Sequence, residues 1–225
     1  MKINSLLLYT SELEDQKHFY RDILGIKLEE SHHDRFTLKI GSTRLTYQEV
    51  EQKSYYHFAI NIPSYQIKEA KDWISKRTKI LPFHGNEIVD FRNWNAEALY
   101  FYDPAGNIVE FIARKNLKIP STSSFDSESF LHISEIGLPV KDVQNVYDLL
   151  NQECDLQKFS GDFQKFCAIG SETGLFITID YNQKDWIPCN DTAFPFPFEC
   201  VIENGNSSFG VIYSKEKIEI VKGKN

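Results

Sequence analysis

The sequence predicts an α+β fold made of tandem βαβββ modules, and three observations support this. Short apolar or alternating segments typical of strands recur around single amphipathic helices, each time in the order strand, helix, strands. This order occurs twice within residues 1–113 and starts a third time at residue 133. A polar, serine-rich segment with a proline, residues 114–130, has the composition of a linker. Repetition of one unit indicates an architecture built from repeated modules.

The first module is predicted within the opening fifty residues. Residues 4–9 form a compact apolar strand, and a helix is expected to start near Ser11, because acidic side chains follow it in the first turn. Gly25 stands where a helix commonly ends on a glycine. The strands expected after it are residues 26–30, 36–40 and 44–47. The unit is therefore βαβββ.

The second module follows without a long connection. Residues 55–62 read as a strand, and an amphipathic helix follows with apolar side chains at positions 67, 70, 73 and 74. Residues 98–102 and 108–112 read as two strands. They are joined by a turn that contains Pro104 and Gly106, which are typical turn residues.

The third module restarts the pattern after the linker, and a reduced fourth module ends the chain. The third has a strand at 133–140, a helix at 143–150 and strands at 166–169 and 175–179. The fourth has only strands, at 198–202, 209–213 and 215–222. We therefore predict a domain of paired modules at 1–113, a linker at 114–130, and a third module with a reduced fourth at 131–225.

Composition excludes several classes of protein. The 225 residues are 41% hydrophobic and 25% charged, with 25 basic against 32 acidic side chains and a net charge of −7. This balance argues against nucleic acid as a partner, and no apolar run is long enough for a membrane span or a signal peptide. The four cysteines lack metal-binding spacing and are interpreted as reduced thiols, so we expect a cytoplasmic protein.

Two motifs resemble those of a known family. FYRDILG at residues 19–25 resembles the FYxxxLG helix end of the vicinal oxygen chelate superfamily, which includes glyoxalase I, fosfomycin and bleomycin resistance proteins and extradiol dioxygenases. YFYDPAGNIVE at residues 100–110 resembles its YFxDPxGNxxE signature. The resemblance covers residues 1–113 and implies cup-shaped mixed sheets around a pocket, the glyoxalase/bleomycin resistance/dioxygenase-like fold. Beyond the linker it is supported only by the renewed strand-helix order.

The resemblance also implies a divalent metal site. Its glyoxalase-like pattern places ligands at His57 and Glu110, while the first-module ligand position falls on Ser5, or on Asn4 if the register slips by one. Imidazole with carboxylate suits Fe, Mn, Zn or Ni, but two protein ligands would hold such an ion weakly. Candidates for a further ligand are Ser5, Gln48, Tyr102 and Glu135, the last of which occupies the first strand of the third module.

Each candidate residue also has a structural interpretation. His57 could be a half-buried histidine without a ligand, and Glu110 lies in an apolar strand where its carboxylate needs a partner. Without metal, Glu110 could act as a general base whose pKa is raised by burial. Tyr102 is a candidate donor to a substrate oxyanion or a packing residue. The candidate substrate-pocket residues are Ser5, Gln48, Asn61, Trp94 and Tyr100.

Two functions follow from these observations. The first is a glyoxalase- or dioxygenase-like protein that acts on a small molecule in the cup through a divalent metal with an incomplete ligand set. The alternative is a metal-free protein of the bleomycin-resistance type that binds or sequesters a small molecule, which the missing ligand at Ser5 favours. An aromatic content of 14% suits an apolar or aromatic ligand in either case. We expect a monomer, because four modules can satisfy one another within one chain.

Overall fold

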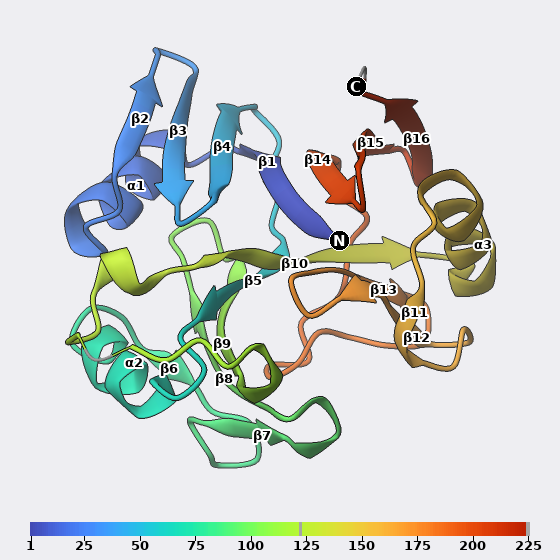
Figure 1. Cartoon of the computed structure of the whole chain (residues 1–225). Helices are drawn as coiled ribbons and strands as arrows, with labels where there is room; N and C mark the ends of the chain where they lie inside the picture. Colours follow the sequence, from blue (N-terminus) through green and yellow to red (C-terminus); the bar gives the residue numbers. More distant parts are fainter. Residues whose placement is uncertain (122, 224–225) are drawn as a thin grey trace.

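The computed structural model describes residues 1–121 and 123–223, and its strands form two mixed sheets (Figure 1). The first sheet has the strand order β16 (Lys217–Lys222), β15 (Ser207–Ser214), β14 (Phe198–Asn204), β1 (Lys2–Thr10), β4 (Thr43–Glu49), β3 (Arg35–Ile40) and β2 (Leu28–Ser31). The second has the order β11 (Lys158–Gly161), β12 (Phe166–Ser171), β13 (Gly174–Asp180), β10 (His132–Val140), β5 (His57–Ile62), β9 (Ile108–Arg114), β8 (Ala96–Tyr102) and β6 (Ile80–Leu81), with β7 (Val89–Phe91) paired to β8. The predicted α+β class is confirmed.

Each of the first three modules contributes one helix at the periphery of the molecule (Figure 1). These are α1 (Leu13–His18), which continues into a π-helical turn (Phe19–Ile23), α2 (Ile67–Ile74) and α3 (Val143–Cys154). Shorter 3-10 turns occur at Arg92–Trp94, Lys115–Leu117 and Ser127–Ser129. The helices pack on strands of their own modules: α2 on β8 and β9, and α3 on β12 and β13.

The modules pair in a nested order. The first strands of modules one and four, β1 and β14, are antiparallel neighbours, and so are β5 and β10 of modules two and three. We had expected modules one and two to pair within residues 1–113, but both sheets draw strands from each side of the linker. The main chain explains this difference, because Leu131 N donates to Asn61 O and starts β10 beside β5. The edge of β1 is thus available to β14.

Most of the predicted linker packs against module two. Arg114 still belongs to β9, and Phe125 and Phe130 are buried against Trp73 of α2. The two aromatic side chains explain why this segment is ordered despite its polar composition. Thr122, within the predicted linker, lies outside the described residues.

Alternation along the strands separates two apolar clusters. On β5, Phe58 and Ile60 belong to a core that also contains Leu6 and Leu8 of β1, so this core joins the two sheets. Ala59 belongs to a second cluster on the other face, together with residues of β8, β9, β12 and β13. The face of the second sheet that carries Ala59 therefore has an apolar cluster of its own.

Two further expectations concern cysteines and membranes. All four cysteines are free thiols, as expected. Within residues 1–121 and 123–223, we find no helix with the length and apolar character needed to span a bilayer.

Candidate metal centre and ligand pocket

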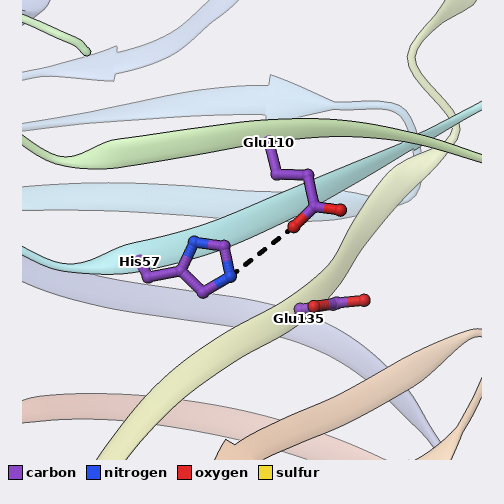
Figure 2. Close-up of side chains that lie close together, drawn as sticks. All are labelled: His57, Glu110 and Glu135. Carbon is purple, nitrogen blue, oxygen red and sulfur yellow. Dashed lines mark ion pairs between the residues drawn. The ribbon is translucent and has the colours of Figure 1, made fainter. Parts of the chain in front are cut away.

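Three strands bring one histidine and two glutamates together in the second sheet (Figure 2). His57 is the first residue of β5, and Glu110 and Glu135 flank Ala59 from β9 and β10 on either side. Side chains two residues apart on a strand share a face, so His57 and Ala59 project from the same face of the sheet. Glu110 and Glu135, which lie opposite Ala59, project from that face as well. The small side chain of Ala59 leaves the space between them open.

The three side chains form a compact buried group. One potential ligand atom from each residue lies within 4.8 Å of the others. His57 Nε2 and Glu110 Oε2 are 3.6 Å apart (Figure 2). The exposed fractions are 5% for His57, 3% for Glu110 and 2% for Glu135. We had predicted His57 and Glu110 as metal ligands and Glu135 as one of four candidates for a further ligand, and the structure brings these three together.

The orientation of His57 favours metal binding. Its Nδ1 lies 3.2 Å from the carbonyl oxygen of Ile108. A carbonyl only accepts hydrogen bonds, so Nδ1 carries the hydrogen and Nε2 keeps a free lone pair on the side of the carboxylates. Burial lowers the pKa of His57 to about 4, so the imidazole is neutral at pH 7.

A buried arginine compensates one of the two carboxylates. Arg114, on β9, is fully buried, forms a salt bridge with Glu135 and donates from Nε to Asn61 Oδ1 at 3.2 Å. Its other terminal nitrogen, Nη1, has no hydrogen-bond partner among the described residues. With neutral His57 and both carboxylates ionised, the three side chains together with Arg114 therefore carry one excess negative charge.

That excess charge defines what fits the site. Burial, followed by the nearby Glu135 carboxylate, raises the pKa of Glu110 well above its ordinary value. Burial also raises the pKa of Glu135, although the Arg114 guanidinium opposes that effect. A divalent cation would supply the missing positive charge, and a set of one nitrogen and two carboxylate ligands suits Fe, Mn, Zn or Ni. The residues present therefore fit a divalent metal.

The internal symmetry of the sheet explains why the group has three members. β5 and β10 run antiparallel, and their register relates them by an approximate two-fold axis that exchanges His57 with Glu135. Glu110 lies opposite Ala59, two residues after His57. Ile177 lies opposite Gly137, two residues after Glu135, so the same axis exchanges Glu110 with Ile177. The fourth equivalent position is thus apolar. Three protein ligands would leave positions open on a bound ion.

The three side chains line a cavity of about 260 Å³ on the face of the sheet that carries Ala59. Its remaining walls are mostly apolar and aromatic, formed by Phe91, Trp94, Tyr100, Phe166, Ile177, Ile179, Trp186 and Ile187, with Lys184 and Asp185. Such apolar pockets with a few convergent polar groups are typical small-molecule sites. We call this cavity the pocket.

One wall of the pocket is a segment we call the strap, residues 181–197, which connects β13 to β14. The Trp186 ring of the strap lies over His57, with ring centroids 5.2 Å apart. Gly137 makes this contact possible, since a Cβ there would lie 2.8 Å from two ring carbons of Trp186. Sequence analysis missed the strap tryptophan, because nothing in the local sequence indicates that the segment folds back over β10.

Tyr102 anchors the strap. Its hydroxyl donates to Asp191 Oδ2 at 2.6 Å, and the backbone of the same aspartate accepts from Trp186 N at 2.8 Å. Tyr102 lines a separate hollow together with Asp191, not the pocket that contains the carboxylates. Burial raises the pKa of this hydroxyl. The structure therefore places Tyr102, which we predicted as a donor to a substrate oxyanion or as a packing residue, in a position to hold the strap.

The predicted pocket residues divide into two groups. Trp94 and Tyr100 line the pocket, and the ring of Tyr100 lies 6.3 Å from His57. Asn61 lies on β5, as His57 does, but is not among the residues that line the pocket; its Oδ1 accepts a hydrogen bond from Arg114.

The other two predicted pocket residues lie in the first sheet. Ser5 lines a separate hollow with Thr46 and Glu199, and Gln48 donates to the backbone oxygen of Asp34 at 3.0 Å. Both were expected beside His57 because module one was expected to pair with module two. The nested order instead places the strands of module one in the first sheet, whereas His57 belongs to the second.

The two sequence motifs meet in one buried network. Asp103 accepts hydrogen bonds from the Tyr20 hydroxyl at 2.7 Å, Gln16 Nε2 at 2.8 Å and Asn107 Nδ2 at 2.7 Å. The Asn107 side chain in turn accepts from the main chain just before β5. These contacts fix the hairpin whose second strand carries Glu110. The motifs thus position the site, and the second motif also supplies Tyr100 and Glu110 to the pocket wall.

Comparisons with known proteins agree with this architecture. No protein-family model matches the sequence, and no curated protein matches it. Among solved structures, a proposed dioxygenase from Bacillus subtilis has a TM-score of 0.65 at 10% identity, over 99% of this chain and 84% of that one. A V278E mutant of glyoxalase I from Zea mays has a TM-score of 0.58 at 13% identity, over 98% and 92%. These similarities confirm the predicted glyoxalase/dioxygenase-like fold.

Proposed function

We propose that this chain is a glyoxalase- or dioxygenase-like metalloenzyme that acts on a small molecule bearing two neighbouring oxygens. The proposal rests on one observation: ligand atoms of the buried side chains of His57, Glu110 and Glu135 lie within 4.8 Å of one another in the wall of a mostly apolar pocket. These three residues would hold the metal. The proposed divalent cation is Fe, Mn, Zn or Ni.

A bound ion would supply Lewis acidity and open positions for two substrate oxygens. The protein supplies the rest of the site. Hydrogen bonding from Nδ1 holds His57 in the tautomer that offers Nε2, and Arg114 holds the carboxylate of Glu135. Trp186 and the aromatic walls bind the apolar body of the substrate and exclude water from its reacting end.

A metal-free binding protein is the second candidate. It is favoured by the salt bridge between Arg114 and Glu135, which satisfies one carboxylate without any metal. A metal-free enzyme, in which Glu110 acts as a general base with a pKa raised by burial, would differ from this binding protein by converting its ligand.

Elemental analysis of protein purified without chelator and without a nickel column separates the two candidates. We expect near-stoichiometric Fe, Mn, Zn or Ni in the native protein and its loss in His57→Ala and Glu135→Gln. His33→Ala is the matched control, because the side chain of His33 is 94% exposed and lies outside the pocket. Absence of metal in the native protein, even after soaking with each ion, would contradict the metalloenzyme proposal and favour the second candidate.

A further inference from the structure

Lys184 is the one lysine among the described residues that line the mostly apolar pocket. Lys184 belongs to the strap and lines the pocket with Asp185. A turn fixes its backbone, because Lys184 N donates to Asp180 O at 3.0 Å and the Asp180 carboxylate accepts from Asn182 N at 2.9 Å. The lysine is therefore held at the pocket by its own local structure.

The ammonium group of Lys184 has no anionic partner. Four other lysines form salt bridges in the described part of the chain, but Lys184 does not. Its Nζ lies 5.9 Å from the centroid of the Phe166 ring, which also lines the pocket. The side chain is half-buried. A cation in a partly dry, aromatic wall interacts more strongly with an anion than a cation in open water does.

The size of the pocket limits the ligand. An apolar protein cavity of about 150 Å³ holds a benzene molecule. The pocket, at about 260 Å³, therefore accommodates one ring or a similar apolar body with small substituents. A substituent of peptide size would extend beyond it.

We infer that the ligand is a small apolar or aromatic molecule with two neighbouring oxygens at one end and an anionic group elsewhere, and that Lys184 binds this anionic group. The inference rests on the proposed function, which places the two oxygens at His57, Glu110 and Glu135. Lys184 then determines specificity: it selects anionic over neutral molecules that share the same pair of oxygens.

Calorimetric titration of the Mn(II)-loaded protein tests this with two probes, 3,4-dihydroxybenzoate and 3,4-dihydroxybenzamide. They share the ring and the vicinal hydroxyls and differ in the charge of one substituent. At low salt we expect the native protein to bind the acid about tenfold more tightly than the amide. This is the gain in affinity expected from one charge-assisted hydrogen bond between the Lys184 ammonium and the carboxylate of the acid. Lys184→Met should abolish this preference, and Lys184→Arg should keep it.

Lys71→Met is the matched control, since Lys71 forms a salt bridge with Glu87 on the surface and does not line the pocket. It should keep the full preference. Equal affinity of the native protein for acid and amide would overturn the inference while leaving the proposed function intact, and so would a preference that survives in Lys184→Met. Failure of both probes to bind the metal-loaded protein would overturn the proposed function and the inference together.

Discussion

Replacing Arg114 by methionine should strongly destabilise the metal-free protein. The substitution keeps much of the apolar side-chain volume but removes the guanidinium from a fully buried position between Asn61 and Glu135. It leaves Glu110 and Glu135 buried side by side without a facing cation. Removing one partner of a buried ion pair costs about 3–5 kcal/mol, which is a large share of a typical free energy of unfolding of about 5–15 kcal/mol.

The cost should grow with pH. Burial raises the pKa of Glu110 and of Glu135. A carboxyl group whose pKa is higher in the folded state binds its proton more tightly there than when unfolded. The contribution of this carboxyl group to the free energy of unfolding is therefore complete at low pH. It is lost as the pH rises from the ordinary pKa, near 4.5, through the raised pKa of the folded state. Without the Arg114 guanidinium, this loss should become steeper.

Urea unfolding in the presence of EDTA measures the change, with Arg44→Met as the matched control. Arg44 also forms two salt bridges, with Glu29 and Glu30, but its side chain is 48% exposed. Exposed pairs contribute about 0–1 kcal/mol, so the control should lose little stability. If Arg114→Met costs no more than Arg44→Met, our account of the buried charges is wrong.

Two further outcomes are expected. Gly137→Ala should lower the free energy of unfolding by about 1–3 kcal/mol, because the added Cβ overlaps the Trp186 ring. Gly210→Ala is the control and should be tolerated, because its Cβ would have no neighbour closer than 3.7 Å. Equal losses of stability in the two variants would refute this prediction. In metal-free protein, unfolded His57 binds protons near pH 6.5 and folded His57 near pH 4. Between pH 7 and pH 4, the free energy of unfolding of the native protein should therefore fall by about 3 kcal/mol more than that of His57→Gln. If the two proteins lose stability in parallel over this range, His57 is not buried in its neutral form.

Local sequence patterns predicted the modules and two of the three proposed metal ligands. His57 and Glu110 could be identified because each lies on a strand with a clear apolar pattern, and a family motif ends on Glu110. Glu135 was a candidate because the first strand of the third module is easily recognised. Its proximity to His57 depends on which strands pair, and the local sequence does not determine that.

The remaining features depend on long-range contacts. Arg114 lies four residues beyond Glu110 on the same face of β9, a spacing that could have indicated a charge partner. Trp186 and Lys184 reach the pocket because the strap crosses the sheet, and Tyr102 faces the strap for the same reason. The misplacement of Ser5 follows from the nested pairing of the modules.

The nested pairing also sets an order for folding during synthesis. All strands of the second sheet lie between residues 57 and 180, so the proposed metal ligands are complete before the ribosome has made β14. β1 is made before the other strands of its sheet and pairs with β4 early, but its other edge has no partner until β14, almost two hundred residues later. Until then this edge is an unpaired strand of the kind that promotes aggregation. The sheet that carries the proposed metal ligands is thus encoded by one continuous segment of the chain. The first sheet, by contrast, cannot pair both edges of β1 until β14 has been made.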